Sequence, residues 1–208
     1  VSPELREKMG HAAVTAAKAA GYVNAGTIEF LLEPDGKFWF MEMNTRIQVE
    51  HPVTEWVTGI DLVKEQLKIA SGMPLEISQE DVRIQGHAIE CRINAENPQK
   101  NFRPSPGTIQ GAHFPGGNGI RVDTCVYNGC KIPPYYDSML AKLIVHAGNR
   151  KEAIAKMQSA LGEVIIDGID TNIDYQYEIL KDEDYQSGNF DTGFLASHII
   201  AGVKINEN

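Results

Sequence analysis

Hydrophobic residues recur every three to four positions in several stretches of the chain, a spacing typical of amphipathic helices. The first stretch is rich in alanine; it begins at Ser2 and Pro3 and ends at Gly21, which are common start and stop signals of a helix. We predict helices over residues 2–20, 60–70, 151–164, 172–180 and 194–200. In the helix of 151–164, one apolar stripe consists of Ala153, Ile154, Met157, Ala160 and Leu161.

Between these helices lie runs of β-forming residues bounded by glycine, proline and asparagine, which is typical of strands. We predict strands over residues 27–33, 37–44, 86–96, 108–114, 120–127 and 138–148. The dipeptide Asp35-Gly36 predicts a two-residue hairpin turn between the first two. The pattern indicates an α+β fold in two units, with a seam between Ser71 and Gln85. We place the domains at residues 1–78 and 79–208.

The composition adds no element to this fold but excludes several classes of protein. The 208 residues are 42% hydrophobic and 23% charged, as in an ordinary soluble globular protein. A net charge of −9 argues against nucleic-acid or anionic-membrane partners, and no apolar run reaches the length of a membrane span. Cys91, Cys125 and Cys130 lack metal-site or disulfide spacing, so we expect reduced core thiols in a cytoplasmic protein.

The predicted hairpin brings two carboxylates together. A two-residue turn at Asp35-Gly36 places Glu29 directly opposite Glu42, and like charges in that position destabilise a sheet. A hard cation such as Mg²⁺ between them removes that cost. Asn44 shares the face of Glu42 because strand side chains alternate. The alternative is that both glutamates lie on a solvated outer face.

The residues that follow add groups suited to an anion. Arg46 and Gln48 offer donors to a small planar oxyanion, and Glu50 offers a base. In the predicted strand 86–96, alternation also places Arg92 on the same face as Glu90. With the two carboxylates, Arg46, Gln48 and Glu50 are typical of a phosphoryl- or acyl-activating site, and a surface ion-pair network is the alternative. The alternative for Arg92 is a structural ion pair with Glu90.

At residues 41–72, the run MEMNTRIQVEHPVTEWVTGIDLVKEQLKIASG closely resembles biotin carboxylase. The resemblance continues through residues 86–98, 102–109, 133–144 and 165–172, and so covers essentially the whole chain. It implies the C-terminal half of an ATP-grasp domain, followed by the family's C-terminal domain of antiparallel sheet plus helices. The implied activity is that of a ligase, the ATP- and bicarbonate-dependent carboxylation of biotin held on its carrier protein.

The resemblance implies a metal and nucleotide site on the predicted hairpin. Glu29 and Glu42 match ligands of Mg²⁺ (or Mn²⁺) and of the ATP phosphates, and Asn44 matches a further metal ligand. The family's N-terminal domain, its glycine-rich lid and its phosphate-binding lysines have no counterpart here. We therefore expect the isolated chain to be inactive.

The resemblance also implies the groups that handle bicarbonate and biotin. Arg46, Gln48 and the backbone of Val49 match the bicarbonate-holding groups, and Arg46 is also a catalytic position. Glu50 matches the general base. Arg92 matches the arginine that contacts bicarbonate and the ureido oxygen of biotin.

The implied system is the biotin carboxylase component of acetyl-CoA carboxylase, in fatty acid synthesis. Its partners are the biotin carboxyl carrier protein, the carboxyltransferase component and a second copy, as a homodimer. Arg121 lies near the family's dimer contact, but Asn118 stands where an aromatic residue is frequent. Asp137 either approaches the biotin pocket or caps its own loop. The alternatives are pyruvate or propionyl-CoA carboxylase, or a noncatalytic assembly module.

Overall fold

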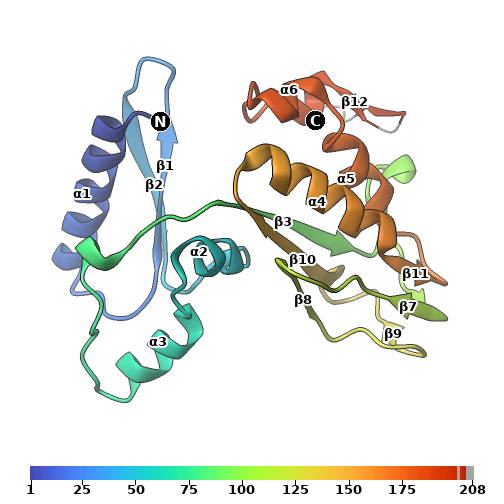
Figure 1. The fold of residues 1–208 in the computed structure, drawn as a ribbon, viewed down its shortest axis with the longest axis horizontal. Coiled ribbons are helices and arrows are strands. Elements are labelled where there is room, and N and C mark those ends of the chain that lie inside the picture. The colour runs from blue at the N-terminus through green and yellow to red at the C-terminus, as the bar shows by residue number, and fades with distance from the viewer. Residues whose placement is uncertain (201, 205–208) are drawn as a thin grey trace. The chain divides into compact units, whose positions relative to one another are not determined.

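The computed structural model describes residues 1–200 and 202–204. The chain forms two compact units, Val1–Arg83 and Ile84–Asn208. Helices and strands carry the labels of Figure 1.

The first unit combines helices with one two-stranded hairpin (Figure 1). Its elements are α1 (Pro3–Ala19), β1 (Thr27–Leu32), β2 (Phe38–Asn44), α2 (His51–Thr58), α3 (Leu62–Ala70) and the 3₁₀ turn η1 (Gln79–Asp81). Ser2 caps α1 by accepting a hydrogen bond from the Leu5 amide at 3.2 Å, as its sequence position predicts. Asp61 caps α3 in the same way, through the Lys64 amide at 2.9 Å. Helix α2 was not predicted.

The hairpin turn differs from the prediction, although the pairing of the two glutamates is confirmed. The Glu33 amide donates to the Lys37 carbonyl at 2.8 Å, so the loop contains three residues instead of two. Gly36 has φ +86°, a conformation that glycine adopts without strain. A bulge in β2 at Met41 then restores the register, and Glu29 faces Glu42. Two departures from the simple hairpin therefore cancel.

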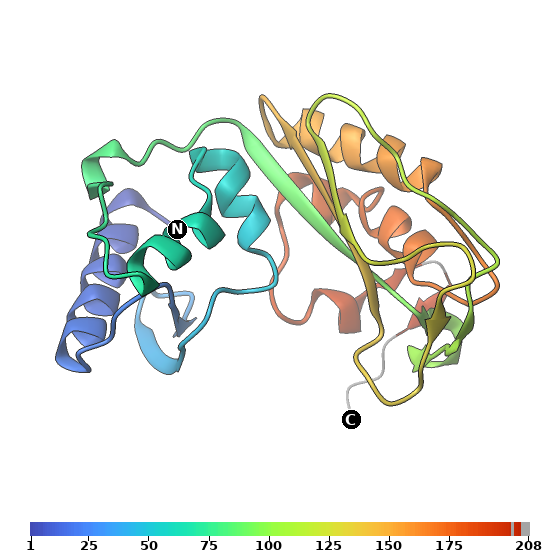
Figure 2. The ribbon, with the colours of Figure 1, turned by 90° about the horizontal axis from the view of Figure 1, so that it is seen from below.

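The second unit is built on a three-stranded antiparallel sheet in the order β3-β10-β8. The strands are β3 (His87–Asn94), β10 (Met139–Ala147) and β8 (Ile120–Thr124). Helix α4 (Arg150–Glu163) covers one face of this sheet (Figures 1 and 2). All five residues of the predicted apolar stripe of α4 are buried in the core against this face.

Shorter elements complete the second unit. The strand pairs are β4 (Glu96–Asn97) with β5 (Arg103–Pro104), β6 (Gly107–Thr108) with β9 (Lys131–Ile132), β7 (Gly111–His113) with β11 (Ile165–Asp167), and β12 (Ile199–Ile200) with β13 (Val203–Lys204). The helices are η2 (Pro98–Lys100), α5 (Ile173–Ile179), α6 (Glu183–Ser187) and α7 (Phe194–Ser197). No helix among the described residues is both long and apolar enough to cross a membrane.

Several predicted elements of this unit are wrong in extent; the strand expected over 120–127, for example, ends at Thr124. The expected strand 108–114 is two strands, because β6 pairs with β9 while β7 pairs with β11. The expected helix 194–200 ends after one turn at Ser197, and the chain continues as β12.

Burial differs sharply between the units. The core consists of second-unit residues, including Ile93, Leu143 and Met157, all at most 1% exposed. Within residues 1–83, Pro52 is the one buried residue. The hairpin instead exposes large apolar side chains, among them Leu31, Trp39 and Phe40, each more than half exposed.

Candidate active site

The predicted metal ligands form one hydrogen-bonded cluster on the hairpin. The Asn44 amide nitrogen donates to Glu29 Oε1 and to Glu42 Oε1, each at 2.9 Å. The two carboxylates face each other across the ladder, and the amide group lies where the sequence predicts a cation. The amide's two N–H groups offset the repulsion between the carboxylates.

This donor set fits a hard divalent cation. Two carboxylate oxygens already converge on a single nitrogen atom, and Mg²⁺ binds one or two protein carboxylates together with phosphate oxygens and water. The Asn44 oxygen, which accepts from Arg46 Nη2 at 3.0 Å, is a further ligand of the right chemistry. The residues present thus suit the metal that the sequence predicts.

Arg46 and Gln48 join the same cluster. Arg46 Nη1 donates to the side-chain oxygen of Gln48 and, at 3.1 Å, to the Ile47 carbonyl. Gln48 Nε2 donates to Glu29 Oε1 at 2.8 Å. The predicted anion-binding donors are therefore adjacent to the predicted metal ligands, as a site for a reaction between an anion and a phosphate requires.

Helix α2 fixes the residues at the end of this loop. Glu50 immediately precedes α2, and its carbonyl accepts from the Val53 amide at 3.0 Å. His51 Nδ1 donates to the Gln48 carbonyl at 2.8 Å, so it holds the backbone of an anion-binding residue. Sequence reasoning missed this role of His51; its place three residues after Gln48 at a helix start is the signal that was available.

Arg92 lies in the second unit, on the sheet face opposite α4. In the ladder it is paired with Lys142, and Lys142 is paired with Asp123. Lys142 Nζ lies 3.3 Å from Asp123 Oδ2, and Arg121 holds the same carboxylate through Nε at 2.7 Å and Nη2 at 2.9 Å. Burial alone would raise the pKa of Asp123, but these two cations hold it below its usual range. The row across three strands carries more positive than negative charge.

Two other residues that the sequence singled out have local partners. Asp137 Oδ1 accepts from the Met139 amide at 2.8 Å, as expected of a residue that caps its own loop. The Asn118 carbonyl accepts from Lys156 Nζ at 3.1 Å.

The cysteines are free, as expected, but only one of them is a core residue. Cys91 is buried, Cys130 is half-buried and Cys125 is exposed, which corrects the expectation of core thiols. Burial raises the pKa of Cys91 to about 12, so its thiol stays protonated at neutral pH.

One group of possible metal ligands among the described residues lies elsewhere, at Asp182, Asp184 and His198. His198 Nε2 lies 3.1 Å from Asp184 Oδ2, and Nδ1 lies 2.8 Å from the Phe194 carbonyl. This is an ion pair that fastens the end of α7 to α6. The described contacts of this histidine are therefore structural.

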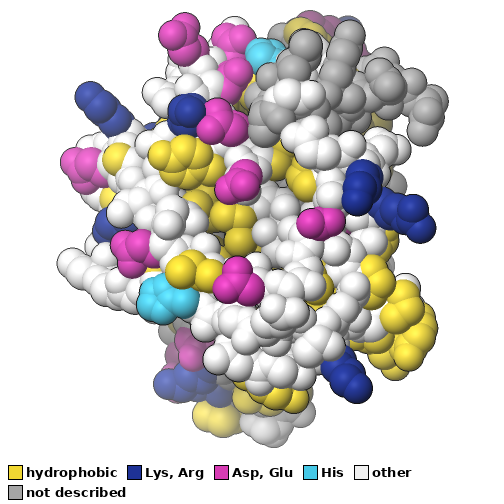
Figure 3. Space-filling model, turned by 90° about the vertical axis from the view of Figure 1, so that its right-hand side faces the viewer, with side chains coloured by type: hydrophobic (Ala, Val, Ile, Leu, Met, Phe, Trp, Pro, Cys, Tyr) yellow, Lys and Arg dark blue, Asp and Glu magenta, His cyan; other side chains and the backbone are white. Residues whose placement is uncertain are grey.

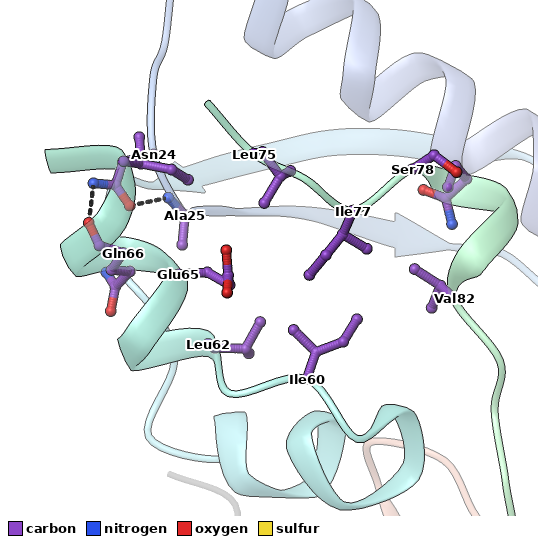
Figure 4. A pocket seen from close by; sticks show the side chains of 12 residues that line it. Asn24, Ala25, Ile60, Leu62, Glu65, Gln66, Leu75, Ile77, Ser78 and Val82 are labelled. Carbon is purple, nitrogen blue, oxygen red and sulfur yellow. Dashed lines mark hydrogen bonds between the residues drawn. The ribbon is translucent and has the colours of Figure 1, made fainter. Parts of the chain in front are cut away.

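Figure 4 shows a separate apolar pocket of the first unit, of about 330 Å³. Ile60, Leu62 and Ile77 line it, and Glu65 lies at its wall with one carboxylate oxygen bound to Lys68 Nζ at 2.9 Å. None of the predicted site residues lines this pocket. On the face drawn in Figure 3, the Lys and Arg side chains are scattered and form no basic stripe.

Comparisons with known proteins identify the family. Residues 90–197, about half of the chain, match the family model of the biotin carboxylase C-terminal domain. The chain belongs to the biotin carboxylase family. Residues 1–78 match the ATP-binding domain of the carbamoyl-phosphate synthase L chain, and both matches confirm the predicted α+β class with an ATP-grasp part.

Relatives within the biotin carboxylase family are similar along almost the whole chain. Biotin carboxylase 1 of Bacillus subtilis is 58% identical over 96% of this chain, and the biotin carboxylase of Haemophilus influenzae is 54% identical over 94%. The chain spans 44% and 43% of their lengths.

Solved structures agree with this assignment. The biotin carboxylase domain of the 2-oxoglutarate carboxylase of Hydrogenobacter thermophilus has a TM-score of 0.92 and 52% identity, over 95% of this chain and 44% of its own. That domain was solved as a dimer, in complex with MgADP, ADP and bicarbonate.

Proposed function

We propose that this chain supplies part of an enzyme that carboxylates biotin on a carrier protein, using ATP and bicarbonate. The observation that carries the proposal is the cluster of Glu29, Glu42, Asn44, Arg46 and Gln48, which joins a paired-carboxylate metal site to an anion-binding arginine. The names of the relatives and the ligands of the 2-oxoglutarate carboxylase domain support the same chemistry.

The first unit's residues then act on bicarbonate and on the nucleotide. Glu29, Glu42 and Asn44 hold Mg²⁺ or Mn²⁺, which neutralises charge on the transferring phosphoryl group. Arg46, Gln48 and the Val49 backbone orient bicarbonate. Glu50 takes the proton of bicarbonate while a bicarbonate oxygen attacks the γ-phosphate of ATP, and ADP leaves. The product, carboxyphosphate, breaks down to CO₂ and phosphate.

Arg92 acts on the second half of the reaction. Phosphate removes the N1 proton of biotin, and negative charge develops on the ureido oxygen as N1 attacks CO₂. A guanidinium aimed at that oxygen stabilises the charge, and loss of such a donor typically costs about 3–4 kcal/mol of activation free energy. The partner of Arg92 in the ladder is a second cation, Lys142.

The carboxylase that this chain serves is a finer proposal. We place it in acetyl-CoA carboxylase, in cytoplasmic fatty acid synthesis, with the carrier protein and the carboxyltransferase as partners and a homodimeric biotin carboxylase. Relatives from a pyruvate carboxylase and a 2-oxoglutarate carboxylase, 56% and 52% identical, are nearly as similar as the biotin carboxylase of Bacillus subtilis. Pyruvate, 2-oxoglutarate or propionyl-CoA carboxylase are therefore the alternatives.

The test uses the Bacillus subtilis biotin carboxylase with its matching stretch replaced by this chain, hereafter the chimaeric enzyme. We expect ATP turnover that requires both biotin and bicarbonate, and none from the 208-residue chain alone. Glu42→Gln should lower turnover by about tenfold or more, because one metal ligand is lost. Glu33→Gln is the matched control, since Glu33 lies in the same hairpin and binds Trp39 Nε1 at 2.7 Å. Equal turnover in both variants contradicts the proposal.

A further inference from the structure

Strand β3 is at the edge of its sheet, and side-chain amides cover its outer edge at Arg92. The backbone amide of Asn94 donates to Asn172 Oδ1 at 2.9 Å, and Asn172 Nδ2 donates to the Arg92 carbonyl at 3.1 Å. The backbone amide of Asn172 also donates to the backbone carbonyl of Asn94 at 3.2 Å. Gln176 Nε2 is a second donor to the Arg92 carbonyl. A carboxamide has one donor and one acceptor end, as a peptide group has, so Asn172 takes the place of a neighbouring strand.

Asn172 gives up its ordinary local role to do this. It is the N-cap residue of α5, where an asparagine side chain usually accepts from an amide of the first helical turn, yet it makes no such bond. It is only 8% exposed. Asn149, the N-cap of α4 in the same unit, does cap its helix through the Glu152 amide at 3.0 Å. The contrast shows that the Asn172 side chain serves β3 instead of its own helix.

The loop that presents Asn172 is itself fixed. The Asp170 amide donates to the Ser105 hydroxyl at 2.9 Å, and Asn97 Nδ2 donates to Asp170 Oδ2 at 2.7 Å. Asn172 is therefore tied on one side to β3 and on the other to the loop that connects β11 with α5. The contact between Asn172 and Arg92, which are 80 positions apart in the chain, is therefore held in a defined geometry.

We propose that Asn172 is a positioning residue for Arg92: its carboxamide fixes the β3 backbone at Arg92 and thereby the direction of the guanidinium. The inference rests on the proposed role of Arg92 at the ureido oxygen. A long arginine side chain has many rotamers, so its aim depends on a Cα atom that does not move. Pairing with β10 fixes one edge of β3 here, and Asn172 with Gln176 fixes the other.

The test is a double-mutant cycle in the chimaeric enzyme. Asn172→Ala should lower biotin carboxylation about 10- to 100-fold, while bicarbonate-dependent ATP cleavage without biotin changes by less than about threefold. In the Arg92→Ala background, Asn172→Ala should have no further effect on carboxylation, because the group that it positions is gone. Multiplicative effects of the two substitutions would overturn the inference.

Two controls separate positioning from loss of stability and from failure of the proposed function. Asn149→Ala removes a helix cap in the same unit without touching β3, so we expect a lower Tm with the ratio of carboxylation to ATP cleavage unchanged. An equal fall of that ratio in Asn149→Ala would overturn the inference. If Arg92→Ala leaves carboxylation intact, the proposed function of Arg92 fails. If Arg92→Ala abolishes carboxylation and Asn172→Ala is harmless, only the positioning role fails.

A second measurement on the 208-residue chain tests the contact itself. Hydrogen exchange of the Asn94 amide should be faster in Gln176→Met, because one of the two donors to the Arg92 carbonyl is lost, and faster still in Asn172→Ala. The Leu143 amide, in the core strand β10, should keep its protection in Gln176→Met. Unchanged exchange at Asn94 in a folded Asn172→Ala variant would overturn the inference.

Discussion

Glu29 and Glu42 face each other across the β1–β2 ladder, and one Asn44 nitrogen donates to both carboxylates at 2.9 Å. Without a cation the arrangement retains part of the repulsion between two like charges. The same arrangement is what a divalent cation needs. Stability and metal binding should therefore respond to mutation in opposite directions.

Glu42→Gln tests this opposition in the chain itself. Removal of one charge should raise the free energy of unfolding of the first unit by about 0.2–1 kcal/mol, as for cross-strand charge pairs in general. In a Mn²⁺ titration, we expect the Tm of the unaltered chain to rise and the Tm of the variant to stay unchanged. Glu33→Gln should change neither quantity, since Glu33 binds Trp39 outside the cluster. A less stable Glu42→Gln variant, or one that still responds to Mn²⁺, contradicts the site.

Met157→Ala tests where the core lies. Met157 is fully buried in α4 against the sheet, so its truncation should cost the second unit about 2–5 kcal/mol. Leu67→Ala in α3, where the side chain is 68% exposed, is the control and should cost far less. Thermal unfolding, monitored by near-ultraviolet circular dichroism, measures the loss of stability in both variants. Equal losses in the two variants would show that Met157 is not a core residue.

The His198–Asp184 pair predicts a pH dependence of stability. The bond to the Phe194 carbonyl and then the Asp184 carboxylate raise the pKa of His198, while bonds from Asn189 and His198 lower that of Asp184. A raised histidine pKa stabilises the fold below the unfolded value of about 6.5, and the gain is lost as pH rises through the folded value. The lowered aspartate pKa favours the fold above about pH 4. The pair therefore stabilises between these limits.

The measurement compares His198→Gln with the unaltered chain by thermal unfolding from about pH 5 to pH 8. The difference in Tm should be largest near pH 5–6 and should shrink as the pH rises. A difference that is constant, or that grows with pH, would show that the ion pair does not stabilise the second unit.

The local elements were predictable because their signals are local. The Ser2 cap is a contact within one helix, and the apolar stripe of α4 is visible in the spacing of residues along one helix; the structure confirms both. The opposition of Glu29 and Glu42 was correct for a partly wrong reason, since a three-residue loop and the bulge at Met41 cancel. Neither the three-residue loop nor the bulge has a clear signal in the sequence.

The contacts that position the site were not predictable in this way. Asn172 meets Arg92 across 80 residues, and no periodic pattern reports so distant a hydrogen bond. Helix α2 was missed because only eight residues form it and Pro52 stands at its start, where proline is tolerated because the first amides of a helix lack partners. A site of this kind needs the fold before its supporting residues can be named.

Arg92→Ala in the chimaeric enzyme tests the central claim most directly. The two half-reactions are measured separately, as bicarbonate-dependent ATP cleavage without biotin and as carboxylation of biotin. We predict that carboxylation falls about 100-fold or more while ATP cleavage falls far less, because the guanidinium stabilises charge that develops only when biotin reacts. Equal losses in the two assays, or undiminished carboxylation, would contradict it.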